Sequence, residues 1–270
     1  MIDQNSPGHE LTAEFERVIT EAAQQMMHAK NFSVKQTMVL ARKALERVAE
    51  KLEEQSYATA IERIAGGDIP APDAWEWRLV DSDGWTLAHY AAMRGLLPDG
   101  FTRWDLTSKQ GYTVAHIAAE QGLLPKGFNH WEFATDSGWT VAHEATANGH
   151  LPEDIGQRVW ALADEDGRTV AHLAAAMGTL PGDFEQWEMA DKEGFTVAHS
   201  AAEFGHLPND FCLWGMTDHA GFTVAHVAAH NGHLPEDFDQ WDLKDHYGRT
   251  VRGIANSYAE NANAAPKFGL

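Results

Sequence analysis

The chain has 270 residues, 44% of them apolar, and is therefore long enough to bury a substantial hydrophobic core. It contains no apolar run of about 18 residues, and its first residues lack the basic-then-apolar pattern of a secretory signal. This excludes a membrane-spanning helix and predicts a cytoplasmic protein. The single cysteine, Cys212, excludes an internal disulfide framework and a multi-cysteine zinc site.

Acidic residues are unevenly distributed along the chain. Residues 1–67 hold 10 acidic and 8 basic side chains, whereas residues 68–270 hold 30 and 12, so the two parts carry net charges of −2 and −18. A surface of that sign repels nucleic acid and anionic membranes and speeds association with basic surfaces. We therefore expect neither a direct nucleic-acid partner nor a membrane partner. The simpler alternative is that the acidic surface only keeps a long chain soluble.

The chain begins with a predicted helical segment, residues 1–55, that contains about two helices. Residues 11–30 are expected to form the first, and Ser33-Val34-Lys35-Gln36 has the pattern of a capping box that begins the second. One face of the second helix is apolar and carries Val34, Met38, Ala41, Leu45, Val48 and Leu52. We expect this face to dock on the first repeats or on the first helix. The alternative is a dimerisation or partner-binding helix.

Residues 56–258 form a tandem array. A glycine followed two residues later by threonine recurs at intervals of 27, 27, 29, 27, 27 and 27 residues, at Gly84, Gly111, Gly138, Gly167, Gly194, Gly221 and Gly248. A tryptophan and a proline recur in the same register. The two extra residues of the fourth interval lie between Pro152 and Trp160, so the insertion falls in one connecting segment. Such regularity predicts stacked structural repeats.

The repeating unit is D-x-x-G-x-T-V-A-H-x-A-A-x-x-G-x-L-P-x-x-F-x-x-W. Its Asp and first Gly predict a tight turn, and its Thr predicts the N-cap of a short helix with an alanine-rich face. In the sixth full unit, Gly232 is expected to end this helix. Pro235 is expected to begin a second short helix that carries Phe238 and Trp241. One unit cannot bury both helices alone, so it must stack on its neighbours.

The segment D-x-x-G-x-T-V-A-H-x-A-A-x-x-G-x-L resembles the ankyrin repeat. The family hallmark T-P-L-H-x-A-A appears here as Thr86-Leu87-Ala88-His89 and in five further copies. The resemblance implies an all-α fold, an ankyrin-like α-solenoid of stacked helix-turn-helix repeats, in which each Thr and His tie one repeat's loops to the next. Ankyrin repeats, however, have 33 residues and a longer, leucine-rich second helix. Here L-P-x-x-F-x-x-W stands in its place.

The two ends of the array are predicted to be capping units. Residues 58–70 match the helix, glycine and L-P elements, with Ile61 where the histidine would stand. At the other end, the unit that begins at Gly248 loses both the Ala and the His of the motif. Caps of this kind cover the bare hydrophobic face of a solenoid. Residues 259–270 are expected to be a frayed tail.

Six histidines share one repeat position and invite a metal or acid–base hypothesis: His89, His116, His143, His172, His199 and His226. Packed helices lie about 8–10 Å apart, whereas zinc needs its ligands within about 2.3 Å, so we expect a structural role instead. His143-Glu144 begins like a zinc-protease motif but lacks the second histidine. No phosphate-binding glycine loop or nucleophile elbow is present. We predict no catalytic residue, metal or cofactor. The alternative is an enzyme with its site in the N-terminal helices or along the groove.

Residues that differ between repeats are the better candidates for recognition. The position just after the turn glycine carries an aromatic or arginine residue in every unit: Trp85, Tyr112, Trp139, Arg168, Phe195, Phe222 and Arg249. We call these residues the ladder. Acidic residues flank it, namely Asp83, Asp136, Glu165, Asp166 and Glu193. Aromatic residues and arginine dominate binding hot spots, so the ladder and its acids are the predicted partner-binding site. The alternative is that the rings only pack against neighbouring loops.

Together these features predict a non-enzymatic, acidic, protein-binding repeat protein, an adaptor or inhibitor that engages a basic protein surface. A sharper hypothesis is that it mimics nucleic acid and acts on a nucleic-acid-binding defence or restriction complex of a bacterium. A different hypothesis is a secreted bacterial effector or scaffold that binds host proteins.

Overall fold

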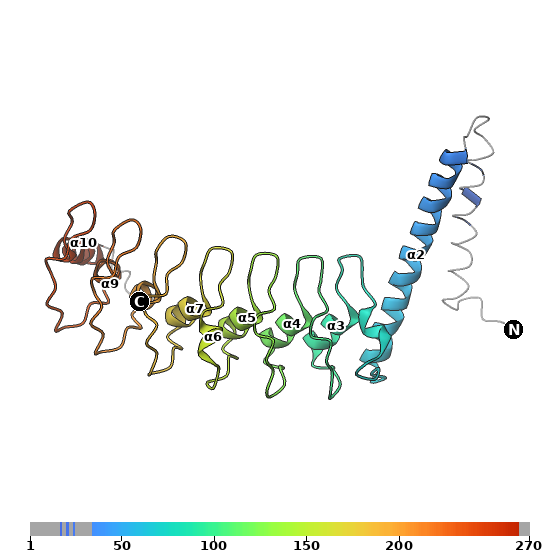
Figure 1. The fold of residues 1–270 in the computed structure, drawn as a ribbon, viewed down its shortest axis with the longest axis horizontal. Helices are drawn as coiled ribbons and strands as arrows, with labels where there is room; N and C mark the ends of the chain where they lie inside the picture. The colour runs from blue at the N-terminus through green and yellow to red at the C-terminus, as the bar shows by residue number, and fades with distance from the viewer. Residues whose placement is uncertain (1–16, 18–19, 22–23, 25–33, 265–270) are drawn as a thin grey trace. The chain divides into compact units, whose positions relative to one another are not determined.

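The computed structural model describes residues 17, 20–21, 24 and 34–264 (Figure 1). The first predicted helix, residues 11–30, lies almost entirely outside these residues. So do the side chains of the predicted apolar face on the second helix. The chain divides into two compact units, Met1–Lys109 and Gln110–Leu270.

The first unit contains a long helix, a short 3-10 helix and the first repeat helix. These are α2 (Val34–Ala65), η1 (Trp75–Arg78) and α3 (Leu87–Arg94). Helix α2 crosses residue 55, where the sequence places the start of the array, because no glycine or proline interrupts residues 34–65. Its last turns bury Ala60 and Ile64. The helix of the predicted capping unit, residues 58–70, is thus the end of α2.

An aromatic cluster forms the core of the first unit. Trp77, on η1, is fully buried and donates its indole N–H to the carbonyl of Ala71 at 2.8 Å. Phe101 packs edge-to-face between Trp77 and Trp104, with ring centroids 5.5 and 5.2 Å apart. Helix α3 packs against both α2 and η1. The cluster therefore completes the core that the short helices alone leave open.

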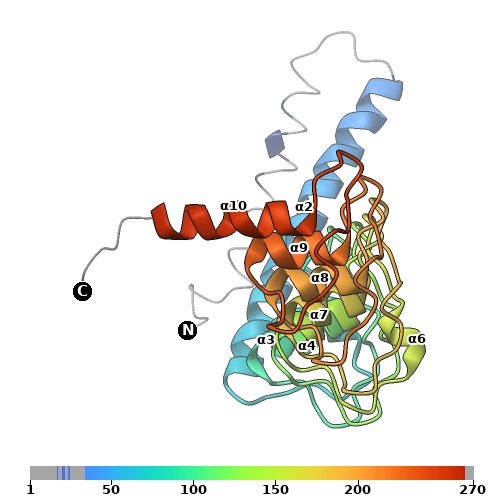
Figure 2. The ribbon, with the colours of Figure 1, turned by 90° about the vertical axis from the view of Figure 1, so that its left-hand side faces the viewer.

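The second unit is a stack of short helices. They are α4 (Val114–Glu120), α5 (Val141–Ala147), α6 (Gln157–Trp160), α7 (Val170–Met177), α8 (Val197–Phe204), α9 (Val224–Asn231) and α10 (Val251–Ala264). Repeat helices that follow one another along the chain are in contact, and Figure 2 shows α7, α8 and α9 behind one another, with their loops to one side. The predicted all-α solenoid is confirmed. Among the described residues, no helix has the length and apolarity needed to cross a membrane.

Small apolar residues make this close stacking possible. The first residue of each repeat helix is a valine with no exposed surface in α4, α5, α7, α8, α9 and α10. The alanines that follow, such as Ala198, Ala201 and Ala202 in α8, have none either. Burying one valine contributes about 1.5–3 kcal/mol. Because alanine adds almost no bulk, neighbouring helices can approach one another closely.

The expected second helix of the repeat does not form. Each Pro-x-x-Phe segment makes one turn, in which the phenylalanine N–H bonds to the proline carbonyl, as in Phe211 to Pro208 at 3.0 Å. The chain then turns once more and extends. Its carbonyls are used by the next helix, since Ala225 N–H bonds to Trp214 and Val224 N–H bonds to Met216. Only at the insertion does an α-helix form in this segment, as α6.

Phenylalanine and tryptophan replace the second helix as the packing layer. Their rings meet edge-to-face within a repeat and between repeats, with centroids 5.2–6.1 Å apart, in the order Trp160, Phe184, Trp187, Phe211, Trp214, Phe238 and Trp241. This geometry places the positive edge of one ring on the negative face of the next. The array is thus held by a helix layer and an aromatic layer.

The last helix continues past Tyr258, where the sequence predicts the frayed tail to begin, and ends at Ala264. The other repeat helices that end at a left-handed glycine, such as Gly232, have it in the position that Ala259 occupies here. Without that glycine nothing stops the helix. The ring of Tyr258 lies over Gly232, where a glycine Cβ would meet it at 2.6 Å, and covers the end of α9.

Candidate functional site

Most of the turns that carry the ladder are built by an aspartate and a glycine, whereas Ser108 and Thr135 take the place of the aspartate in the turns of Tyr112 and Trp139. In one of them, an Asp191 carboxylate oxygen accepts the N–H groups of Glu193 and Phe195, both at 2.9 Å. Gly194 adopts a φ of 79° and donates its N–H to the Asp191 carbonyl. Asp81, Asp164 and Asp245 hold their turns in the same way. The backbone of a ladder residue is thereby fixed whatever its side chain is.

Adjacent turns are joined through their backbones. Glu165 N–H bonds to the carbonyl of Ser137 at 2.9 Å, and His219 N–H bonds to that of Glu193 at the same distance. The turn glycine lies directly beneath the next turn, where a Cβ on Gly138 would meet the nitrogen of Glu165 at 2.7 Å. The turns therefore form a continuous wall along the stack.

The repeated threonine and histidine close each helix start. Thr196 N–H donates to Nδ1 of His199 at 3.1 Å, and His199 N–H donates to the Thr196 hydroxyl at 3.3 Å. Val197 and Ala198 N–H donate to the carbonyls of Met189 and Trp187. All the amides that a helix start leaves unpaired are thus occupied.

The second ring nitrogen of the same histidine reaches the next repeat. Nε2 of His199 donates to the carbonyl of Phe222, a ladder residue, at 3.2 Å. His116, His143, His172 and His226 make the same bond to the next ladder residue. Because Nδ1 accepts from an amide and Nε2 faces a carbonyl, the ring is neutral with its proton on Nε2. The structural role predicted for these histidines is confirmed, and neither nitrogen is left for a metal.

Burial lowers the pKa of His116, His143, His172 and His199 below the ordinary value of 6.5, against a smaller upward effect of the carbonyl bond. The charged form would lose solvation and would set a proton on Nδ1 against the threonine amide. These four groups are therefore poor candidates for proton transfer near neutral pH.

A second set of histidines joins the other end of the helices. Nδ1 of His150, His206 and His233 donates to the carbonyl of Ala119, Ala175 and Ala202, at 3.0–3.2 Å. Each ring also lies over the glycine that follows the preceding helix. These histidines are exposed, yet each one caps a helix of the preceding repeat.

Four ladder side chains, Trp85, Tyr112, Trp139 and Phe195, are half-buried and lie against the histidine of their own repeat. Ring centroids of Phe195 and His199 are 5.0 Å apart, and those of Trp139 and His143 are 4.9 Å apart. Trp139 also donates its indole N–H to Glu144 at 2.8 Å. One part of each ring thus packs within the repeat, and the rest is accessible. Arg168 and the flanking acids Asp83, Asp136, Asp166 and Glu193 are exposed.

Five of the predicted residues line a single groove of about 1390 Å³ in the second unit: Arg168, Glu193, Phe195, Phe222 and Arg249. The turns form one wall. The opposite wall comes from helix positions that the sequence reasoning missed, including Glu203 of α8, Val227 and His230 of α9, and Ile254 and Tyr258 of α10. Tyr112, Trp139, Asp136 and Asp166 lie outside this lining, and Trp85 and Asp83 belong to the first unit. The sequence signal that could have indicated this wall is that the fourth and seventh residues of the repeat helices differ from one repeat to the next.

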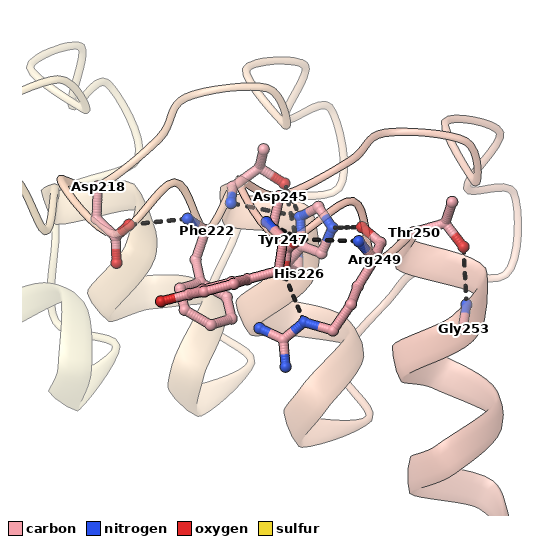
Figure 3. Close-up of polar contacts among 9 residues, drawn as sticks. Asp218, Phe222, His226, Asp245, Tyr247, Arg249, Thr250 and Gly253 are labelled. Carbon is pink, nitrogen blue, oxygen red and sulfur yellow. Dashed lines mark hydrogen bonds and ion pairs between the residues drawn. The ribbon is translucent and has the colours of Figure 1, made fainter.

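The C-terminal end of the groove is held by an arginine cluster (Figure 3). Arg249 donates Nε–H to Asp245 at 2.7 Å, and its guanidinium lies over the rings of Phe222 and Tyr247, at 5.0 and 5.2 Å. Burial raises the pKa of the Asp245 carboxyl, but the hydrogen bonds from Arg249 and Tyr247 outweigh it and lower that pKa overall. Arg249 is therefore engaged by the fold, although 51% of its side chain is exposed.

Among solved structures, the chain is similar to the ankyrin repeat domain of Bcl-3, described as a unique member of the IkappaB protein family. The TM-score is 0.45 and the sequence identity 18%, over 65% of this chain and 98% of that one. No protein-family model and no curated protein matches the sequence.

Proposed function

We propose that this chain is a non-enzymatic repeat protein that binds a protein partner in the groove between Arg168 and Tyr258. The groove itself carries the proposal: one continuous hollow is lined by ladder residues from successive repeats and closed at one end by α10. A hollow that runs along successive repeats suits an extended segment or a loop of another protein, and its aromatic side chains supply binding energy. Hydrogen bonds within and between the turns hold the backbone of its ladder wall, which lowers the ordering cost of binding.

We further propose that the partner surface is basic. Glu193 and Glu203 are exposed on opposite walls of the groove, and Asp218 adds a third carboxylate. Residues 68–270 carry a net charge of −18, which attracts a basic protein from a distance. A partner that normally holds nucleic acid has such a surface. Inhibition of a bacterial defence or restriction complex, by competition with its nucleic acid, is the sharper form of this proposal.

Reversing the charge of the groove is expected to abolish binding. In the full chain, Glu193→Lys with Glu203→Lys places two cations where the partner's cations would lie, and capture from a bacterial lysate should fall at least tenfold. The matched control is Glu188→Lys with Glu236→Lys, which makes the same charge change at exposed positions outside the groove. Captured proteins are identified by mass spectrometry at low and high salt.

Each result of this experiment has a clear meaning. Equal capture by the wild type, the groove variant and the control would refute the groove as the binding site. Acidic captured proteins, or capture that does not weaken as salt is raised, would refute the basic partner while leaving the groove in place.

A further inference from the structure

A second type of hollow lies between the Leu-Pro loops of consecutive repeats, away from the groove. One example, of about 300 Å³, is bordered by Phe184, Trp187, His206 and Phe211. Another, of about 450 Å³, is bordered by the residues at equivalent repeat positions, Phe128, Trp131, His150 and Ile155. The two sites have the same construction, but the second is larger by half. The larger hollow lies where the two-residue insertion interrupts the 27-residue period.

The difference arises at residue 155. In the neighbouring steps, a phenylalanine places its ring edge-to-face on the tryptophan of the preceding repeat, with Phe211 5.6 Å from Trp187 and Phe238 5.2 Å from Trp214. Trp131 is followed in this register by Ile155, which has no ring. Val159, on the inserted α6, packs onto the core nearby but does not border the hollow. Trp131 has the ring contact with Phe128 of its own repeat, at 5.2 Å, but it lacks a ring contact from the following repeat, where Ile155 stands.

The walls of the hollow change in character from inside to outside. Leu124, Phe128, Trp131 and Ile155 are partly buried, whereas Lys126, Asn129 and Asp154 are exposed. The two hollows differ in volume by roughly 150 Å³, and both are open to solvent on one side. The total volume is within the usual range for small-molecule sites.

We propose that this hollow is a binding site for a small aromatic molecule with one polar group. The aromatic ring takes the place of the absent phenylalanine ring beside Trp131 and Ile155, and the polar group lies at the rim near Lys126 and Asn129. The other repeats indicate the chemical class of the ligand, because at the equivalent position they place a phenylalanine ring against the tryptophan of the preceding repeat. This site is separate from the groove and does not depend on the proposed protein partner.

Benzyl alcohol is the probe for this site, and methyl NMR of the isoleucines is the measurement. Adding it to the full chain should shift the Ile155 δ1 methyl and the Trp131 indole N–H through the ring current. The methyls of Ile117 and Ile254, which do not border the hollow, serve as internal controls. Cyclohexylmethanol, similar in size but without a π-system, should bind more weakly because it cannot make the edge-to-face contact.

Ile155→Phe tests the proposal from the protein's side. This variant restores the ring that the other repeats carry, so benzyl alcohol binding should fall at least tenfold without a loss of thermal stability. Unchanged binding in this variant would overturn the proposal. An absence of shifts at Ile155 and Trp131 in the wild type at about 20 mM benzyl alcohol would overturn it too, because that concentration is well above the dissociation constant of ~1 mM usual for fragments of this size. This result does not depend on how the variant folds.

Discussion

Lowering the pH from 7 to 5.5 is expected to destabilise the repeat array steeply. His116, His143, His172 and His199 have pKa values below 6.5 in the folded chain because they are buried. In the unfolded chain the same rings have ordinary pKa values near 6.5. Between the two values the unfolded state binds more protons, so the free energy of unfolding falls as pH falls. Each ring contributes up to about 1.4 kcal/mol per pH unit, and the four effects add.

Urea denaturation at pH 7, 6.25 and 5.5, at constant ionic strength, measures this slope. The variant His199→Gln isolates one ring, because glutamine at this position can still bond to the Thr196 N–H in a capping box but does not titrate. It should be less stable than the wild type at pH 7 and should lose less stability on acidification. A wild-type stability that stays constant over this range would show that the buried rings do not control the pH dependence.

Alanine at the turn glycine is expected to be among the most damaging single substitutions. Gly138 has a φ of 77°, and an added Cβ would lie 2.7 Å from the Glu165 nitrogen, which already bonds to the Ser137 carbonyl. Gly138→Ala therefore combines backbone strain with a clash against backbone that cannot move without breaking the wall of turns. We expect it to lower the free energy of unfolding by about 3 kcal/mol or more.

Two other glycines separate these effects. Gly127 has a φ of 83° but nothing within 4 Å of an added Cβ, so Gly127→Ala should cost only the strain, about 1–2 kcal/mol. Gly182 has neither a positive φ nor a close neighbour, so Gly182→Ala should change stability by less than about 0.5 kcal/mol. Chemical denaturation of the three variants should reproduce this order. Equal effects at Gly138 and Gly127 would show that the contact between turns contributes nothing.

Several local structures could be predicted because each depends on residues close in sequence. The helix that begins after Thr196, its histidine at the third position and its glycine end are all specified within about ten residues. The continuation of α10 was missed, although Ala259 in place of glycine was a readable signal. Local backbone chemistry can thus be read from a single unit and checked against the other copies.

The candidate site was predicted only in part. The ladder position was identified because it varies while its neighbours do not, and its residues Arg168, Phe195 and Phe222 line the groove. The opposite wall was missed because residues such as Glu203 and His230 become its neighbours only when the helices stack. Which ladder residues share one hollow also depends on the stacking.

The sequence by itself determined the repeat, its 27-residue period, and the turn and cap chemistry, because these follow from short-range backbone hydrogen bonding. Only the tertiary structure decided the fate of the second helix. In the stack, the Pro208–Phe211 segment makes one turn, and the carbonyls of Trp214 and Met216, at the end of the segment and beyond it, accept from Ala225 and Val224 of the next helix start. These bonds hold the chain that follows the turn against α9, and a partner from the next helix cannot be read from one unit. The tertiary structure also set the width of the hollows, since the space at Ile155 depends on the ring of Trp131 in the repeat before it.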